Sequence, residues 1–190
     1  MNKFIKAQTI LTKNFGLVIC ALFLSSFYSG PCGRPQDAPN LTTVSSVNLN
    51  SYLGKWYEIA RYPNGFERGC ENVTAEYSLA NDGSVNVKNS CFVKGKLKIA
   101  NGRAQIIEGS NGARLAVNFA PIPLPKGQGN YHILYIGNNY QTALVGEPSG
   151  KFLWMLARTP QISAEARQEL DNAAINQNYN LNLLENVKQN

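Results

Sequence analysis

The chain has 190 residues, of which 44% are hydrophobic and 16% are charged, a composition typical of one globular domain with its own core. Its formal net charge of +6 includes three lysines near the N-terminus, and without them the chain carries only +3. That charge is too small to indicate nucleic-acid binding, and no basic run or RNP-like aromatic pattern supports such a function.

Residues 1–31 have the features of an export signal. Three lysines precede the apolar run Phe15–Phe27, which is shorter than the roughly 20 residues that a bilayer-spanning helix needs. A basic segment followed by a short apolar segment is typical of a secretory signal that is cleaved, and a buried N-terminal helix is the alternative. We therefore expect an exported protein, located in the periplasm or at the outer membrane.

Cys32 follows this segment at the place where a bacterial lipoprotein carries its acylated cysteine. The preceding Ser29-Gly30-Pro31 departs from the usual lipobox, because the leucine is missing and a proline lies at the cleavage bond. Either Cys32 is acylated and anchors the chain to the outer-membrane surface, or cleavage occurs upstream and leaves a soluble protein. The polar, proline-containing residues 32–47 predict a tether or an N-terminal strap, followed by a folded domain over 48–190.

The folded part alternates between short strand-type segments and turn signals. Asn-Gly and Asp-Gly are strong hairpin turns because both residue types tolerate positive φ, and they occur at 64–65, 82–83, 101–102 and 111–112. Some of the predicted strands can be one interrupted strand, so eight strands are as consistent with the pattern as nine. The predicted strands are Trp56–Tyr62, Val73–Leu79, Val85–Phe92, Leu97–Ala100, Ala104–Ile107, Leu115–Phe119, Tyr131–Ile136, Thr142–Gly146 and Leu153–Arg158.

A single helix is predicted after these strands. Ser163 is a suitable N-cap, and residues 164–177 place one apolar face on the helix, made of Ala166, Leu170, Ala173 and Ala174. A short last strand is expected at Tyr179–Leu183, where polar and apolar residues alternate. Many short strands followed by one helix favour an antiparallel sandwich or a closed barrel.

Two cysteines of the folded part are expected to form a disulfide. An oxidising compartment favours the bond between Cys70 and Cys91. A hairpin centred on Asn81-Asp82-Gly83 places Cys91 within a residue or two of the position opposite Cys70, and a β-bulge can absorb that offset.

Residues that could carry catalysis are scarce. The one histidine, His132, lies in an apolar strand pattern without a cysteine or carboxylate at ligand spacing, so we interpret it as a structural or exposed imidazole. No phosphate-binding glycine loop, nucleophile elbow or paired-cysteine motif is present. We expect no catalytic residues, no metal and no cofactor.

Strand alternation divides the aromatic and apolar residues between two faces. If Trp56 faces inward, Ala60 shares its face, since side chains alternate along a strand. Val117 and Phe119 share a face on another strand, and Trp154 shares one with Arg158. These faces fit either a packed sandwich core or a closed barrel of about eight strands that holds one small ligand, and periodicity alone does not separate the two.

Three motifs resemble the signatures of the lipocalins, in the order found in that family. Gly54-x-Trp56-Tyr57 resembles the first signature, Asn139–Val145 resembles the second with Asn in place of Asp, and Arg158 resembles the arginine of the third. The stretch Tyr57–Cys91 and the segment Leu153–Pro160 look like those of bacterial lipocalins, whose relatives include apolipoprotein D.

The resemblance implies an all-β fold, an eight-stranded antiparallel up-and-down barrel with one C-terminal α-helix packed outside. It implies that Gly54, Trp56 and Arg158 close one end of the barrel, with the guanidinium stacked on the indole. It also implies storage or transport of amphipathic lipids, such as fatty acids or lysophospholipids, in the bacterial envelope for membrane maintenance. By strand parity, the residues expected to line the lipid cavity are Ala60, Tyr77, Val117, Phe119 and Trp154.

Two other functions stay open at this stage. One is a lipocalin-fold enzyme acting on a lipidic substrate, for which Cys70 or Cys91 as a free thiol is the available nucleophile. The other is a protein-interaction module with an empty barrel, pairing through exposed strands or the loop Pro121–Gly129. A homodimer is also kept as an option, and the expected small-molecule partner is a lipid.

Overall fold

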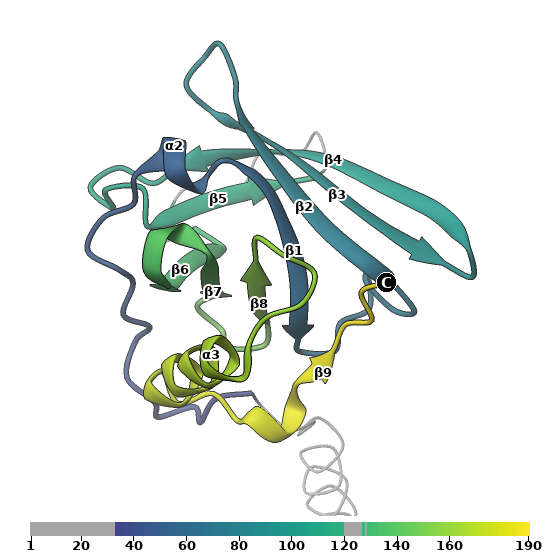
Figure 1. Ribbon diagram of the computed structural model, residues 1–190. Helices are drawn as coiled ribbons and strands as arrows, with labels where there is room; N and C mark the ends of the chain where they lie inside the picture. The colour runs from purple at the N-terminus through teal and green to yellow at the C-terminus, as the bar shows by residue number, and fades with distance from the viewer. Residues whose placement is uncertain (1–32, 120–126, 128) are drawn as a thin grey trace, which may run out of the picture. The chain divides into compact units, whose positions relative to one another are not determined.

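The structure, a computed structural model, describes residues 33–119, 127 and 129–190 (Figure 1). The predicted export signal and Cys32 lie outside the described residues, as does most of the loop Pro121–Gly129.

Eight antiparallel strands form a closed barrel in which each strand pairs with the next along the chain. The barrel closes because β1 pairs with both β2 and β8. This arrangement confirms the predicted eight-stranded up-and-down barrel. The strands are β1 (Gly54–Arg61), β2 (Glu71–Leu79), β3 (Val85–Val93), β4 (Lys96–Ile106), β5 (Arg114–Asn118), β6 (Tyr131–Ile136), β7 (Thr142–Gly146) and β8 (Leu153–Ala157).

The segments predicted as Leu97–Ala100 and Ala104–Ile107 are one strand, β4, so the expected turn at Asn101-Gly102 is absent. The ladder between β3 and β4 runs without interruption from Val85↔Ala104 to Val93↔Lys96. The chain reverses instead at Lys94-Gly95, where both residues have positive φ, as a two-residue hairpin loop requires. Eight strands, not nine, therefore make up the barrel.

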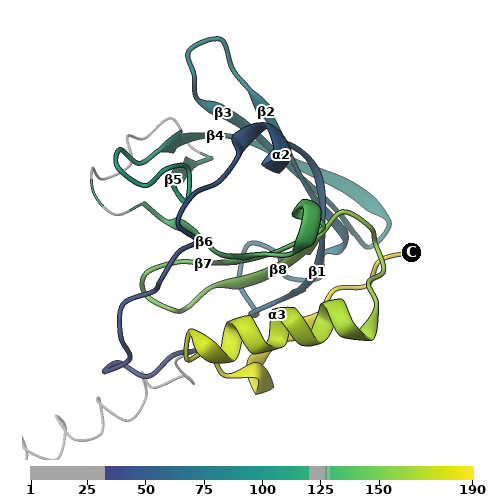
Figure 2. The same cartoon turned by 60° about the vertical axis from the view of Figure 1, so that its left-hand side comes forward.

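Helix α3 (Ala164–Asn176) packs on the outside of the barrel, against β6 and β7 (Figure 2). It begins where predicted, because the Ser163 hydroxyl accepts a hydrogen bond from the Ala166 amide. Its buried residues Leu170 and Ala174 contribute to the helix-side cluster, which lies between barrel and helix. The buried residues of this cluster are Ala60, Tyr62, Leu134, Leu144, Leu153, Met155, Leu170, Ala174 and Tyr179.

The strand predicted at Tyr179–Leu183 is wrong. The Asn180 side chain accepts a hydrogen bond from the Asn182 amide and starts the 3-10 turn η2 (Leu181–Leu183). The extended segment comes later, as the two-residue strand β9 (Glu185–Asn186), which pairs with the end of β1.

Residues 33–47 lie along the barrel and are hydrogen-bonded to it. The Gly33 carbonyl accepts hydrogen bonds from the Tyr62 hydroxyl and the Asn180 amide. Further along, the Val44 amide donates to the Ile133 carbonyl. The segment then enters the short helix α2 (Leu49–Tyr52), which leads into β1 at the end of the barrel where β1 begins. We call this the base, and the opposite end the mouth.

Near the mouth, β1 and β2 separate, and the C-terminal segment 185–190 fills the gap. Their pairing is limited to Gly54–Tyr57 of β1. Beyond it, the Val187 amide donates to the Ile59 carbonyl, and the Lys188 carbonyl accepts from the Asn72 amide. The Gln189 side-chain amide donates to the carbonyls of both Glu58 and Val73, so it bridges the two strands.

The predicted disulfide between Cys70 and Cys91 is confirmed, with 5.4 Å between the two Cα atoms. Glu71 pairs with Phe92, whereas Thr74 pairs with Ser90, so β2 carries a bulge between these positions. Asn72 in this bulge has positive φ. The extra residue in this bulge brings Cys91 nearer to Cys70 than an unbroken ladder would, and so takes up part of the offset that counting from the Asn81-Asp82-Gly83 turn puts between the two cysteines.

Candidate functional site

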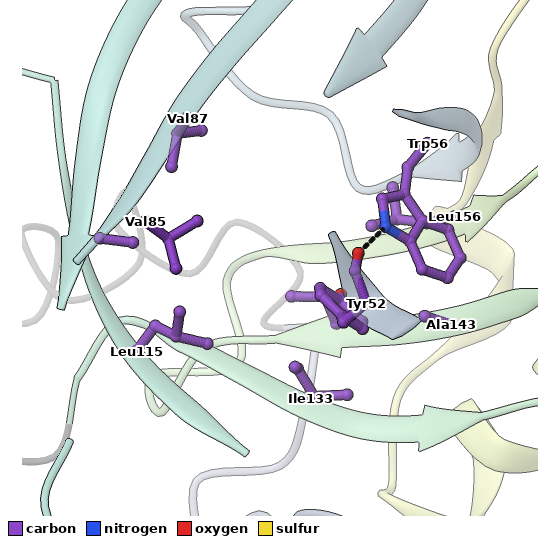
Figure 3. Packing of buried hydrophobic residues seen from close by; sticks show 10 residues of the cluster. Tyr52, Trp56, Val85, Val87, Leu115, Ile133, Ala143 and Leu156 are labelled. Atoms are coloured by element: carbon purple, nitrogen blue, oxygen red, sulfur yellow. Dashed lines mark hydrogen bonds between the residues drawn. The ribbon is translucent and has the colours of Figure 1, made fainter. Parts of the chain in front are cut away.

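The inward-facing side chains of the barrel form the interior cluster, shown in Figure 3. These residues come from α2 and from seven of the barrel strands, and they are almost all apolar. Partly buried side chains, among them Tyr77, Val117 and Trp154, pack against the cluster. The buried members are Tyr52, Trp56, Val85, Val87, Ala104, Leu115, Ile133, Ala143, Val145 and Leu156.

A tryptophan and an arginine seal the base. Trp56 is fully buried, and its indole N–H donates to the Tyr52 carbonyl at 2.8 Å (Figure 3). The Arg158 guanidinium carbon lies 3.7 Å from the centroid of the Trp56 ring, a cation–π geometry. Arg158 also donates hydrogen bonds to the carbonyls of Ser51, Tyr52, Lys55 and Tyr140. It therefore ties α2, β1 and the β6–β7 connection to the indole.

Gly54 allows the chain to turn from α2 into β1 beside this pair. Its φ of 91° lies in the region that favours glycine. The Arg158 Nη1 atom would lie 3.6 Å from a Cβ at this position, which is ordinary contact. Backbone conformation, not lack of space, is thus the reason for glycine here.

Three tyrosines meet inside the barrel next to the base. The Tyr131 hydroxyl lies 2.7 Å from that of Tyr52 and 3.0 Å from that of Tyr77. Burial raises the pKa of all three hydroxyls, that of Tyr77 to about 12. They therefore stay neutral at physiological pH and act as hydrogen-bonding groups, not as anions. Sequence reasoning proposed only Tyr77, although Tyr131 shares the strand parity of the inward-facing Ile133.

A charged cluster lies farther along β1, toward the mouth. Arg61 Nη1 lies 2.7 Å from Glu58 Oε1, and both side chains are buried. Arg61 also donates to the Glu67 carbonyl, while the Trp154 indole N–H donates to a Glu67 carboxylate oxygen at 3.3 Å. Burial, and then repulsion from Glu67, raises the pKa of Glu58 well above its usual range, against the opposing effect of Arg61. Two carboxyl groups and one guanidinium thus face the interior.

Aromatic rings continue from Trp154 toward solvent. Phe152 stacks on Trp154 with ring centroids 5.7 Å apart, and Phe66 packs on Phe152 at the same centroid distance. Phe66 is 68% exposed. The mouth therefore has an apolar aromatic rim beside the charged cluster.

The predicted lining residues do not all share one location. Tyr77, Val117 and Trp154 pack against the interior cluster. Phe119 lies just beyond β5, with 48% of its surface exposed. Its ring lies against Gly102 of β4. Gly102 pairs with Val87, a member of the interior cluster, so Phe119 lies at the edge of that cluster.

Ala60 is a correction. It is fully buried, but in the helix-side cluster and not in the interior cluster. The register between β1 and β8 shifts at a bulge between Glu58 and Ala60, which reverses the facing of the residues that follow. Arg61 faces the interior in its place, opposite Trp154.

His132 is buried on the outer wall of the barrel, in register with Arg114 of β5. Both residues line a polar pocket of about 350 Å³ between the N-terminal strap and the β4–β5 turn. Within the described ranges, no group of three or more His, Cys, Asp or Glu side chains is arranged to hold a metal ion. Among the helices that the structure describes, none has the length and apolar character needed to cross a membrane.

Comparison with known proteins gives one consistent result. The model of the lipocalin-like domain family matches residues 47–189. The chain is 37% identical over 157 residues to the outer membrane lipoprotein Blc of Escherichia coli K12, covering 81% of this chain and 86% of that protein. Its identity to the Blc lipoprotein of Vibrio cholerae is 39%, covering 77% and 81%.

More distant proteins share the fold. Mouse apolipoprotein D is 28% identical over 148 residues, covering 74% of this chain and 72% of that protein. The solved structure of insecticyanin from the tobacco hornworm Manduca sexta superimposes with a TM-score of 0.65 at 17% identity, covering 81% and 87%.

Proposed function

This chain belongs to the lipocalin family, and we propose that it binds amphipathic lipids inside its barrel, with fatty acids or lysophospholipids as the ligand class. The observation that carries the proposal is the division of the interior. Its base is sealed by Trp56 and Arg158, whereas the inward-facing Trp154, paired with Arg61 toward the mouth, keeps part of its surface exposed. Tyr77 and Val117 lie deeper in the barrel and are also only partly buried.

The acyl chain would lie against the apolar inward faces of the strands. Each buried methylene contributes about 0.8 kcal/mol, so roughly ten methylenes contribute ~8 kcal/mol before the cost of ordering the ligand. Micromolar affinity corresponds to about 8 kcal/mol net, so contacts of the polar head must offset the ordering cost. The neutral tyrosine hydroxyls near the base offer hydrogen bonds without introducing a charge beside the chain.

The polar head would stay near the mouth, where Glu58, Arg61 and Glu67 lie. A guanidinium and carboxylates next to an aromatic rim supply partners for both anionic and cationic groups of a head group. The interior is thus apolar along the strands and polar near the mouth, which suits an amphipathic ligand better than a fully apolar one.

We place this activity in the bacterial envelope, where the protein would store or transfer lipids for membrane maintenance. The relatives in Escherichia coli and Vibrio cholerae carry the name outer membrane lipoprotein. Export by residues 1–31 and acylation of Cys32 would put this chain in the same place. A soluble periplasmic form is the outcome if cleavage occurs upstream of Cys32.

We propose a binding function and not catalysis. The enzyme alternative needs a free thiol, and Cys70 and Cys91 are joined in a disulfide. The buried Glu58 is engaged by Arg61 at 2.7 Å. The charged cluster is therefore read as a head-group site.

Mass spectrometry of organic extracts of the purified protein tests the carrier function directly. Co-purified fatty acid or lysophospholipid at a substantial fraction of one molecule per chain is the expected result. Failure to recover lipid, together with no uptake from added fatty acid, would leave the interaction module with an empty barrel as the better explanation.

A substitution tests the location of the ligand. Trp154→Ala should weaken binding of a fluorescent long-chain fatty acid by about 10- to 100-fold, because it removes a large apolar contact inside the barrel. Tyr57→Ala is the matched control, since Tyr57 lies next to Trp56 on the opposite face of β1. Unchanged affinity in the Trp154→Ala titration, with circular dichroism showing a folded barrel, would contradict the assigned lining.

A further inference from the structure

The hairpin of β3 and β4 carries an uncovered apolar face. Phe92 pairs with Leu97, and Ile99 lies two residues farther along β4, so the three side chains project from one face. They alternate with the interior residues Val85, Val87 and Ala104, and the ladder has no bulge, so this face points away from the interior. Phe92, Leu97 and Ile99 are 39%, 54% and 51% exposed. Large apolar side chains gathered on one exposed surface indicate an interaction site.

The same hairpin is strongly basic. From Val85 to Ile107 the chain contains four lysines and one arginine but no acidic residue. Lys88 and Arg103 pair with Glu76 and Asp82. Among the described residues, no ion pair is found for Lys94, Lys96 or Lys98, and all three are exposed. We call Phe92, Leu97 and Ile99 together with these three lysines the basic hairpin.

The basic hairpin is held rigidly at the mouth. Its tip, Lys94-Gly95, is a tight two-residue turn at the end of the barrel opposite α2. The disulfide fixes Cys91, next to Phe92, to the start of β2. A rigid, basic and apolar projection beside the entrance of a barrel is suited to contact with the surface from which a lipid enters.

We propose that the basic hairpin docks the mouth of the barrel onto an anionic lipid bilayer. Lys96 and Lys98 alternate with Leu97 and Ile99, so they project from the opposite face of β4. The hairpin would therefore enter the head-group layer with its tip, and Lys94, Lys96 and Lys98 would reach lipid phosphates through their aliphatic stems. Phe92, Leu97 and Ile99 would enter the boundary between head groups and acyl chains. The contact is reversible, because three lysines and three side chains bind far more weakly than a membrane-spanning helix.

Charge favours a bilayer over a second copy of the chain as the occupant of this surface. Symmetric pairing would place two hairpins of the same net positive charge side by side, and like charges repel. A bilayer containing phosphatidylglycerol presents the complementary sign over an area that matches the whole hairpin. This docking goes beyond the proposed binding function, since it does not depend on whether the barrel is loaded.

Vesicle sedimentation tests the proposal with the full chain, so that residues 1–32 contribute equally to every variant. The vesicles contain equal parts of phosphatidylglycerol and phosphatidylethanolamine, and phosphatidylcholine vesicles serve as the neutral reference. The triple variant Lys94→Gln, Lys96→Gln, Lys98→Gln should bind the anionic vesicles about 100-fold more weakly, because each lysine near an anionic surface strengthens binding about fivefold. The control triple Lys55→Gln, Arg114→Gln, Arg167→Gln changes the net charge equally and should bind like the wild type.

Lysine acetylation followed by mass spectrometry locates the contact. Anionic vesicles should protect Lys94, Lys96 and Lys98 from the reagent while Lys55 stays reactive. Equal vesicle binding by both triple variants, or equal protection of Lys55, would overturn the proposal. Trp154→Ala should dock normally, so a failed docking experiment and a failed lipid-binding experiment remain distinguishable.

The apolar part has its own test. Leu97→Thr with Ile99→Thr puts a residue of high β-propensity at both positions and should lower anionic-vesicle binding at least tenfold. Sedimentation velocity without vesicles checks the competing occupant. If the wild type is a dimer that this double variant converts to a monomer, the face belongs to a second copy and the proposal is wrong.

Discussion

Glu58 and Arg61 place charged groups inside an otherwise apolar barrel. Their pairing at 2.7 Å offsets part of the cost of removing both from water. A second carboxylate, Glu67, shares Arg61 and leaves the cluster with more acidic than basic groups. The protonation of Glu58 therefore depends strongly on its surroundings, which makes this residue the best place to test the electrostatics of the interior.

The raised pKa of Glu58 predicts how stability changes with pH. As pH rises above the ordinary glutamate value of 4.5, the unfolded chain releases a proton that the folded state still holds, so the free energy of unfolding falls until pH passes the raised pKa. Glu58→Gln should remove this decline, so the variant gains stability relative to the wild type as pH rises. Urea unfolding at a series of pH values measures the difference.

Two comparisons isolate the effect of Glu58. Glu108→Gln changes an exposed carboxyl group and should leave the decline in place. Hydrogen bonds from Ser84 lower the pKa of Asp82 to about 2, so its contribution is lost only as pH falls below the usual aspartate value of 3.8. A Glu58→Gln curve parallel to that of the wild type above pH 4.5 would show that Glu58 does not titrate as inferred.

At the scale of elements, the close contact between β4 and β5 explains why Asn101-Gly102 lies in a strand and not in a turn. Asn101-Gly102 has the composition of a hairpin loop, yet Gly102 lies in the middle of a strand. A Cβ at Gly102 would lie 2.6 Å from the Asn118 carbonyl oxygen and 2.8 Å from the Phe119 ring. Glycine here permits close approach of β5, and does not provide a turn.

Gly102→Ala should therefore destabilise the barrel by about 1–3 kcal/mol, because β5 must move away from β4 to admit the methyl group. Gly65→Ala is the control, since a Cβ there meets no atom within 4 Å. Chemical denaturation of both variants measures the change. Equal stability of the two would show that the β4–β5 contact adapts freely.

The sequence predicted the arrangement of strands better than their local irregularities. The lipocalin signature residues predicted that Trp56 lies beside Arg158. The alternation of side chains along strands predicted that Tyr77, Val117 and Trp154 face the interior cluster. A β-bulge has no comparable sequence signature, so strand alternation predicted the wrong face for Ala60, which follows the bulge in β1. The turn at Lys94-Gly95 was missed because lysine rarely signals positive φ.

At the scale of the whole molecule, the C-terminal segment completes the barrel wall. It supplies partners for the carbonyls of Glu58, Ile59 and Val73 where β1 and β2 separate. Val187 also packs against the cluster that contains Cys70, Val73 and Cys91. A segment remote in sequence thus closes the side of the barrel next to the charged cluster.

Deletion of Val187–Asn190 should lower the free energy of unfolding by about 2–4 kcal/mol, because several backbone groups lose their partners. Hydrogen exchange should rise at Glu58–Arg61 and Glu71–Thr74. Gln189→Ala, which removes only the two bridging hydrogen bonds, should give a smaller loss. An unchanged exchange rate in the truncated protein would mean that the segment is not needed to close the wall.

The hydrogen bonds of Gly33 fix the start of the N-terminal strap near the mouth of the barrel. Tyr62, which follows the last residue of β1, and Asn180 fix the Gly33 carbonyl at the mouth side of the outer wall. Attachment through the preceding residue, if it occurs, would therefore join the barrel on the side of its mouth and not at the end sealed by Trp56. The distance between the entrance and the attached surface would then be short.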